Sequence, residues 1–184
     1  MFITGVPAAL AEQARDNAGK PFPWGGDYTH VQEVTCRLQA ADVENGIKQV
    51  NPRTTVPVVV GDVSWRSLDI FNRALHGEGR YAYFRVDPRF VPFGTTNLEI
   101  TAVVRRVAPD KVARIGVTYE SLKGYRPSPP FQILPADDQW HELTWKVTDA
   151  SFAGGWGWNF RLDGSGSPND VWIKEVRVKK TAVP

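Results

Sequence analysis

Residues 139–178 decide the fold, and they read QWHELTWKVTDASFAGGWGWNFRLDGSGSPNDVWIKEVRV. Leu143, Trp145 and Val147 alternate with polar residues, which is the period of two expected when one face of a β-strand is buried and the other is wet. A second alternation of apolar and polar residues runs from Trp158 to Leu162. The stretch therefore predicts at least two short, half-buried strands.

A third strand begins at Val171 and Ile173, but its alternation breaks at Lys174-Glu175. A β-bulge after Ile173 would let Val176 and Val178 face inward as well, because a bulge inserts one extra residue into a strand. Glycine-rich turns separate the three strands, at residues 154–155 and 164–168. The sequence predicts an antiparallel arrangement with a bulged last strand.

The same period continues upstream, in residues 81–86, 98–104 and 113–119. The last two of these are expected to pair as a hairpin through the turn at Pro109. Shorter strands are predicted at residues 29–38, 47–50, 56–60 and 131–134, and the proline-rich segments 20–27 and 123–130 are predicted loops. Strands recurring roughly every ten to fifteen residues without helices between them favour a β-sandwich over alternating strands and helices.

Length and composition are those of one globular domain. The chain has 184 residues and a net charge of +2, which is too small to indicate nucleic-acid binding. Its apolar runs, such as residues 56–60, are far too short to span a bilayer, so no membrane partner is expected. Cys36 is the one cysteine; it excludes an internal disulfide and is expected to be an inert core residue.

The first 24 residues differ from the rest. Residues 7–17 are good helix formers, with Pro7 suited to the first turn and Gly19 to the end of a short helix. No secretion signal is visible, since the start lacks a basic region and a long apolar region. We expect residues 1–24 to be a linker or helix, or the tail of a preceding domain, and residues 25–184 to form the sandwich.

Several of these features together resemble a known family of modules. Trp140 opens a strand, Thr148-Asp149-Ala150-x-Phe152 follows, then a short strand with Asn159, Phe160 and Arg161, and a last strand ending in Val176-x-Val178. This pattern resembles galactose-binding-like β-sandwich (jelly-roll) modules, including the carbohydrate-binding modules of bacterial glycoside hydrolases and lyases. The resemblance covers roughly residues 43–178, with residues 81–87 as an earlier central strand.

The resemblance implies an all-β fold of two antiparallel sheets. It also implies a non-catalytic module that binds a polysaccharide or oligosaccharide and targets a covalently linked, polysaccharide-degrading catalytic domain to its glycan. Such a protein would act outside the cell or in the periplasm. Two alternatives stay open: a jelly-roll polysaccharide lyase or glycoside hydrolase, and a purely structural accessory sandwich.

Catalytic motifs are sparse. The sequence has no glycine-rich phosphate loop and no nucleophile elbow, and its three histidines, His30, His76 and His141, lie far apart. The adjacent Asp137 and Asp138 would diverge on a turn rather than converge across a cleft as in a glycosidase. For a lyase, the candidate residues are Tyr81, Tyr83 and Arg85, which share one strand face; that face is more simply the outer surface of a sheet.

Aromatic residues are the stronger indication of function. Seven tryptophans are many for this length, and sugars present flat C–H faces that pack on aromatic rings beside polar groups. Trp145 follows the core alternation, whereas Trp158 is either core or rim. The candidate ligand-binding residues lie in polar or glycine-rich segments, where no periodicity requires them to be buried. They are Trp156 first, then Trp65, Trp24 and Tyr125. Arg161 and Asn159, next to Trp156, are the expected partners of sugar hydroxyls.

A structural calcium ion is a further expectation from the resemblance, since sandwiches of this kind often carry one near the first and last strands. Calcium takes oxygen ligands from carboxylates and carbonyls. Glu44, near the first strands, and Asp170, before the last, are the candidates. No other cofactor is expected.

Overall fold

The computed structural model describes residues 24, 26–39, 41–50, 80–91, 94–165 and 167–182, and the backbone alone of residues 56–60 and 63–68. The predicted helix at residues 7–17 and the proposed boundary near residue 24 lie outside the described residues or at their edge.

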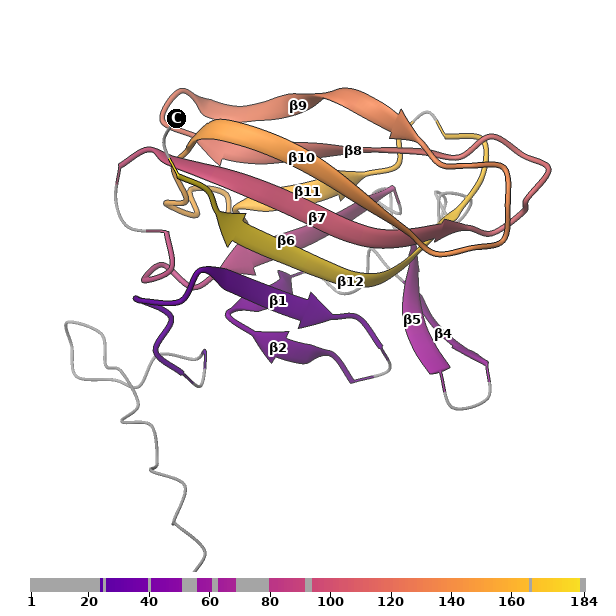
Figure 1. Cartoon of the computed structure of the whole chain (residues 1–184), viewed down its shortest axis with the longest axis horizontal. Coiled ribbons are helices and arrows are strands. Elements are labelled where there is room, and N and C mark those ends of the chain that lie inside the picture. Colours follow the sequence, from indigo (N-terminus) through magenta and orange to yellow (C-terminus); the bar gives the residue numbers. More distant parts are fainter. Residues whose placement is uncertain are drawn as a thin grey trace, which may run out of the picture.

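The secondary structure of the described residues is all strand (Figure 1). The strands are β1 (Glu33–Arg37), β2 (Val43–Asn45), β3 (Ile47–Val50), β4 (Val56–Val60), β5 (Val63–Leu68), β6 (Tyr81–Val86), β7 (Thr96–Arg106), β8 (Arg114–Ser121), β9 (Gly124–Ile133), β10 (His141–Ala150), β11 (Phe160–Asp163) and β12 (Val171–Lys180). The prediction of an all-β chain is confirmed.

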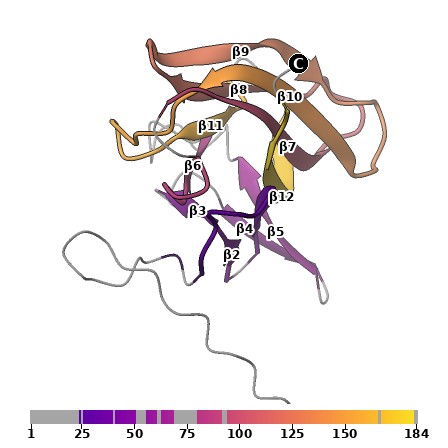
Figure 2. The ribbon, with the colours of Figure 1, turned by 60° about the vertical axis from the view of Figure 1, so that its left-hand side comes forward.

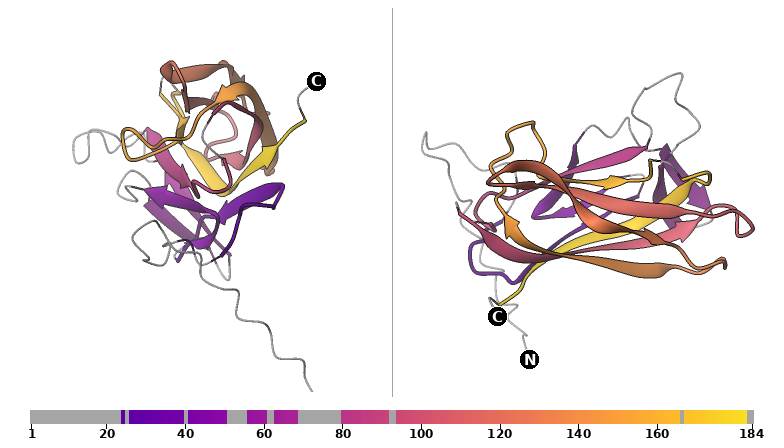
Figure 3. Two further views of the ribbon diagram at one scale, coloured as in Figure 1. Left: turned by 90° about the vertical axis from the view of Figure 1, so that its left-hand side faces the viewer. Right: turned by 90° about the horizontal axis from the view of Figure 1, so that it is seen from above.

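The strands form two antiparallel layers. The hydrogen-bonded order runs β2-β1-β12-β7-β10-β8-β11-β6-β3, with β9 on the free side of β8 and the β4–β5 hairpin on β12. Ala150 and Ser121 are the only register pair between β10 and β8, so the path folds over at this point. The first sheet is β2-β1-β12-β7-β10 and the second is β3-β6-β11-β8-β9; Figures 2 and 3 show the strands wrapping round the core. The predicted two-sheet sandwich is confirmed.

One hydrophobic core lies between the sheets. Both layers contribute every second residue, as the alternation requires. Six apolar residues from the alternating segments 81–86, 98–104, 113–119 and 139–178 are all buried there: Phe84, Ile100, Val117, Leu143, Phe160 and Ile173. The rings of Phe84 and Phe160 stack at a centroid distance of 5.1 Å across β6 and β11, so the second sheet is packed through paired aromatic rings.

The bulge predicted in the last strand is present. Ile173 pairs with Val104, but Glu175 pairs with the next residue, Val103, so the register shifts by one residue at Lys174. Val176 and Val178 consequently return to the core and are fully buried. The extra residue thus keeps apolar side chains inside on both sides of the break.

The predicted hairpin between residues 98–104 and 113–119 is wrong. β7 pairs with β10 and β12 in the first sheet, whereas β8 pairs with β11 and β9 in the second. The connection crosses from one sheet to the other, and the buried guanidinium of Arg106 donates to the carbonyls of Pro109, Lys111 and Leu134. Sequence alternation specifies which residues face inward but not which sheet each strand joins.

The predicted loop at residues 123–130 is wrong as well, because these residues form most of β9. Proline removes a backbone donor, so it is tolerated in a strand that needs donors on one side only. β9 pairs with β8 alone in the named ladders, and Pro127 lies opposite Thr118. The proline-rich composition therefore marks an edge strand.

Candidate functional site

The outer face of the second sheet carries an unusual set of side chains. Ala82, Phe84 and Val86 of β6 point into the core, so Tyr81, Tyr83 and Arg85 point away from it. By the same alternation, Arg161 and Asp163 of β11 and Glu120 of β8 lie on this outer face. The face thus combines aromatic rings with fixed charges.

Five aromatic residues on this face form a continuous cluster, which we call the aromatic platform: Tyr81, Tyr83, Tyr125, Trp156 and Trp158. Tyr125 stacks on Trp156 with centroids 4.4 Å apart and an interplanar angle of 18°. Its ring also lies 4.1 Å from that of Trp158. Trp158 meets Tyr83 edge-on at 5.3 Å, and Tyr83 lies 5.9 Å from Tyr81. The rings run from the Trp156 turn across β9 to β6.

The side chains of the platform range from buried to exposed. Trp158 and Tyr83 are each only 7% exposed, yet neither belongs to the core cluster between the sheets. Trp156 is 71% exposed and is the most exposed large apolar side chain of the described residues. A buried aromatic base therefore supports one exposed indole, which is the arrangement that a flat apolar ligand needs.

Glycines shape the turn that presents Trp156. Gly154 and Gly157 have φ values of +73° and +83°, a region that residues with a Cβ rarely adopt. The N–H of Gly157 donates to the carbonyl of Gly154 at 2.9 Å and closes the turn around Trp156. The indole consequently projects from a tight turn rather than from a strand.

Glu120 fixes this turn to the sheet. Its buried carboxylate accepts the backbone N–H of Gly154 at 2.7 Å and that of Gly155 at 2.9 Å. It also accepts the side-chain amide of Asn159 at 2.9 Å. Hydrogen bonds to a charged acceptor are the strong ones in proteins, so three of them on one carboxylate make the turn rigid.

Tyr125 holds the turn from the other side. Its hydroxyl donates to the carbonyl of Trp158 at 2.6 Å and accepts the N–H of Trp156 at 3.0 Å. Burial raises the pKa of the Tyr125 hydroxyl, so it stays protonated at neutral pH. Tyr125 thus supplies a stacked ring and one hydrogen bond to the exposed Trp156, and a second hydrogen bond to the buried Trp158.

Arg161 lies beside the platform. Its guanidinium is 3.9 Å from the centroid of the Tyr81 ring and 3.6 Å from the Asp163 carboxylate. Its side chain is only about a quarter exposed, at 24%. Arg161 therefore offers a positioned cation next to aromatic faces, a combination that suits hydroxyl-rich ligands.

The structure does not support Asn159 as a sugar ligand. This residue is 2% exposed, and both ends of its amide are used inside the protein. Its oxygen accepts the N–H of Val86 at 2.8 Å while its nitrogen donates to Glu120. Asn159 is thus part of the scaffold under the Trp156 turn.

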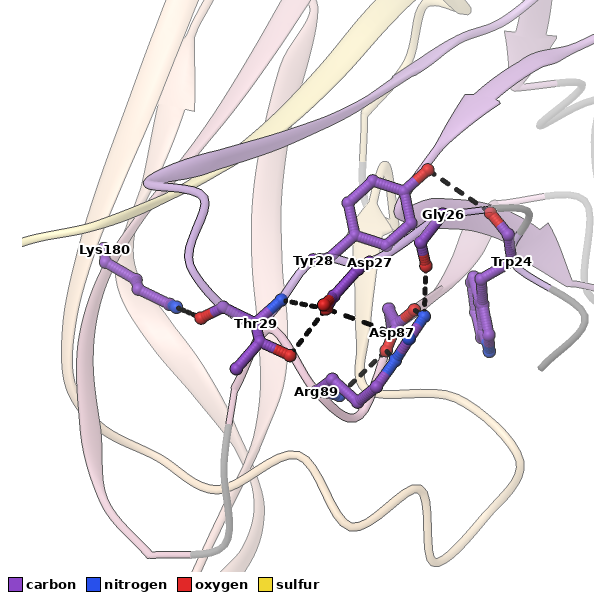
Figure 4. A network of polar contacts seen from close by, with 8 residues as sticks. All are labelled: Trp24, Gly26, Asp27, Tyr28, Thr29, Asp87, Arg89 and Lys180. Carbon is purple, nitrogen blue, oxygen red and sulfur yellow. Dashed lines mark hydrogen bonds and ion pairs between the residues drawn. The ribbon is translucent and has the colours of Figure 1, made fainter. Parts of the chain in front are cut away.

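Trp24 also departs from its prediction as an exposed stacking residue, because it is only 9% exposed. The ammonium of Lys48 lies 5.3 Å from its ring, and its carbonyl accepts the Tyr28 hydroxyl at 3.2 Å. Figure 4 shows Arg89 tying this segment to Asp87 and to the Gly26 carbonyl. Polar contacts hold the segment against the sandwich, and the ring is covered.

The side chain of Trp65 lies outside what the structure describes, although its backbone pairs with Val58 in the β4–β5 hairpin. Its predicted role stays a prediction.

The two candidate calcium ligands do not meet. Glu44 of β2 lies opposite Cys36 of β1, and Cys36 lies opposite Val176 of β12. Asp170 precedes β12, six residues from Val176, which is roughly 20 Å along the strand at about 3.3 Å per residue. Glu44 instead pairs with Lys48 at 3.2 Å. In the described part of the chain, no group of three or more His, Cys, Asp or Glu gathers as metal ligands would. Nor does that part contain a helix that could cross a membrane.

Nothing in the sequence indicates the role of Glu120, and the alternation leaves open whether Trp158 lies in the core or at its rim. Val117 and Tyr119 point inward, so the alternation along β8 places Glu120 on the outer face, and this position could be inferred from the sequence. The contact of Glu120 with residues 154–159 could not be inferred. The alternation in the sequence predicts a strand that includes Trp158, whereas β11 begins only at Phe160. The turn before it directs Trp158 to the outer face.

Comparison with known proteins identifies solved structures of similar fold. No protein-family model matches this chain, and no curated protein does. Among solved structures, the tandem of family 22 carbohydrate-binding modules of Xyn10C from Paenibacillus barcinonensis matches with a TM-score of 0.50 and 10% identity, over 85% of this chain and 49% of that one. The first of those modules alone, described as a xylan-binding domain, matches at 0.49 and 9% over 82% and 95% of the two chains.

A further match is the family 22 module joined to the catalytic module of Clostridium thermocellum xylanase 10B, with a TM-score of 0.49 and 14% identity over 83% of this chain and 29% of that one. At such identities the likeness extends to the fold and not to the ligand. The chain has the β-sandwich fold found in carbohydrate-binding modules.

Proposed function

We propose that this protein binds carbohydrate without transforming it, through the aromatic platform on the outer face of its second sheet. The observation that carries the proposal is the exposed indole of Trp156, stacked on Tyr125 and held by a turn that Glu120 anchors. An apolar ring exposed to this degree costs solvation free energy in the unbound protein, so its rigid support is best explained by a ligand that covers it.

The chemistry of the platform fits a sugar. A pyranose ring has an apolar C–H face for Trp156 and Tyr125 and equatorial hydroxyls for charged or amide groups at the rim. Arg161 supplies donors beside the rings, and its pairing with Asp163 limits the entropy lost on binding. A preorganised site of this kind binds a ligand without rearrangement of the backbone.

The separation of the acidic residues on this face does not fit glycoside hydrolysis. Two catalytic carboxylates lie within about 5 to 9.5 Å of each other in glycosidases. Glu120 and Asp163 are the acidic residues that we place on the outer face, and Asp163 lies opposite Gly116, four residues from Glu120 along β8, or roughly 13 Å. Both oxygens of Glu120 already accept backbone or amide donors.

The lyase alternative is weakened in the same way. Tyr83 is 7% exposed and packs on Trp158, and the Tyr81 ring is covered by the Arg161 guanidinium. A base in a lyase has to reach the proton next to a carboxylate of the substrate, and a buried tyrosine hydroxyl does not. These residues serve the platform better as support.

The module would hold a covalently linked, polysaccharide-degrading catalytic domain on its glycan, outside the cell or in the periplasm. Linkage raises the effective concentration of the catalytic domain at the polymer without any new contact. This part of the proposal follows from the resemblance to carbohydrate-binding modules.

The test is affinity gel electrophoresis of the purified protein against a panel of soluble neutral polysaccharides, with Trp156→Ala and Trp172→Ala as matched variants. Trp172 lies half-buried on β12 in the first sheet, near Arg105, and controls for loss of a tryptophan away from the platform. We expect retardation by at least one polysaccharide, abolished in Trp156→Ala and retained in Trp172→Ala. A central aromatic contact contributes about 2 kcal/mol or more to binding, which is roughly 30-fold in Kd.

Two outcomes would contradict the proposal. One is binding that survives Trp156→Ala but disappears in Trp172→Ala, which would move the site to the first sheet. The other is binding to no polysaccharide at all, which would favour a structural accessory sandwich. Release of reducing ends or unsaturated sugars by repurified protein would instead revive the enzyme alternatives.

A further inference from the structure

A second feature of the outer face lies at the end away from Trp156. A pocket of about 390 Å³ is lined by Arg80, Arg114, Phe131 and Ser165. Its volume is within the range of small-ligand pockets, which hold about 300 to 1,000 Å³. Arg80 precedes β6, Arg114 begins β8, Phe131 belongs to β9 and Ser165 follows β11, so four separate segments converge on it.

The pocket adjoins the platform through the register of the sheet. Asp163 of β11 lies opposite Gly116 on one side and opposite Tyr81, a platform residue, on the other. The Phe131 ring lies directly over Gly116, because a Cβ at that glycine would sit 3.1 Å from ring carbons. The platform and the pocket are therefore neighbouring parts of one surface.

Charge distinguishes the pocket from the platform. Among the lining residues that the structure describes, two are arginines and none is acidic. The nearby acid, Asp163, accepts the N–H of Ser165 at one carboxylate oxygen, at 2.8 Å, and pairs with Arg161 through the other, at 3.6 Å, so both of its oxygens have partners within the protein. Guanidinium groups stay charged at any physiological pH and match the two oxygens of a carboxylate or sulfate with paired donors.

The pocket also has an apolar wall. Phe131 is 42% exposed, and its ring can lie close against Gly116 because that residue has no side chain. A sugar ring could pack on this face while a charged substituent faced the arginines, and Ser165 would add a hydroxyl for hydrogen bonding. A free inorganic anion would not use the aromatic wall.

From this arrangement we propose that the pocket formed by Arg80, Arg114, Phe131 and Ser165 is a subsite for an anionic sugar residue, so that the protein prefers glycans carrying carboxylate or sulfate groups. This inference rests on the proposed function, since it extends the same glycan from the neutral platform into a charged subsite. The shared chemistry is an oxyanion on a pyranose; uronic acids and sulfate esters are its two sources.

The experiment compares polysaccharides that differ only in charge. Polygalacturonate and glucuronoxylan are each paired with their carboxyl-reduced forms, and dextran sulfate is paired with dextran. Retardation in affinity gels and Kd from calorimetry are measured for wild type, Arg114→Gln, Arg80→Gln and Arg37→Gln. Arg37, on β1, is exposed and pairs with Glu175, so its variant removes the same charge from the first sheet.

We expect wild type to bind at least one acidic form about tenfold more tightly than its neutral partner. Arg114→Gln should lose most of that preference, by on the order of tenfold in Kd, since a charge-assisted contact of this kind contributes that much. Affinity for the neutral form should stay unchanged. The carboxylate and sulfate pairs identify which oxyanion is preferred.

Equal binding of each charged and neutral pair would overturn the inference, as would an equal loss in Arg37→Gln and Arg114→Gln, which would indicate a general charge effect. The proposed function is read separately, from the effect of Trp156→Ala on neutral polymers. A Trp156-dependent interaction that is indifferent to charge would leave the function standing and refute the subsite.

Discussion

Replacement of Glu120 by glutamine is the change that probes the Trp156 turn most sharply. The glutamate accepts three N–H donors, two at Oε2 and one at Oε1. Glutamine has the same shape but only one acceptor oxygen. If that oxygen takes the place of Oε2, the new amide NH₂ faces the N–H of Gly155, and one hydrogen bond becomes a contact between two donors.

The free energy follows from this count. A hydrogen bond to a charged group contributes about 1.5 to 3 kcal/mol, and the two bonds that remain weaken because their acceptor is neutral. We therefore expect Glu120→Gln to lower the free energy of unfolding by about 2 to 4 kcal/mol. Glycan affinity should also fall, because the turn that holds Trp156 against Tyr125 would loosen.

Urea unfolding followed by tryptophan fluorescence measures the first effect, and calorimetric titration with the best polysaccharide from the panel measures the second. Glu142→Gln is the matched control, since Glu142 is an exposed residue of β10 that pairs with Arg177. A change in unfolding free energy below about 0.5 kcal/mol, the range of ordinary surface substitutions, would refute the anchoring role of Glu120. Unchanged affinity in a destabilised protein would refute the link from the turn to the site.

Two further predictions concern stability. Burial, together with the hydrogen bond to Asp149, raises the pKa of Tyr119 to about 12; the unfolded chain loses this proton near pH 10 while the folded protein keeps it, so about 2 to 3 kcal/mol of stability should disappear as the pH rises from about 10 to 12. Unfolding of Tyr119→Phe across the same pH range should lack this decline, and parallel pH profiles would contradict the assignment. Gly157→Ala should cost roughly 1 to 2 kcal/mol, since φ is +83° there and no atom lies within 4 Å of an added Cβ, so that backbone strain alone acts; a neutral effect in thermal unfolding would show that the turn adopts another conformation.

The sequence specified the buried face of the strongly alternating strands well. Alternation identified Phe84, Phe160 and Ile173 as core residues, and the break at Lys174-Glu175 located the bulge. It could not assign strands to sheets, because inward-facing residues look alike in either layer. It also read the prolines of residues 123–130 as a loop, whereas an edge strand tolerates them.

The candidate site was predictable only in part. The glycines around Trp156 indicated that the residue is exposed, and the structure places it at 71% exposure. The sequence around Asn159 and Trp24 is equally polar and does not indicate burial. Both are nevertheless buried, and both contact residues distant in the sequence: Asn159 donates to Glu120, and the Lys48 ammonium lies over the Trp24 ring. The pocket of Arg80 and Arg114 joins residues from four segments that the sequence gives no reason to associate.

The most direct test of the central claim is an NMR titration of ¹⁵N-labelled protein with an oligosaccharide of the glycan that binds best. The chain has seven tryptophan indole N–H groups as probes, with Trp156 and Trp158 on the platform and Trp172 on the first sheet. Binding at the aromatic platform predicts large, saturable shifts for the Trp156 indole and for the backbone amides of Tyr125 and Arg161, with the Trp172 indole on the first sheet unaffected. Shifts confined to the first sheet, with Trp156 unmoved at saturation, would contradict it.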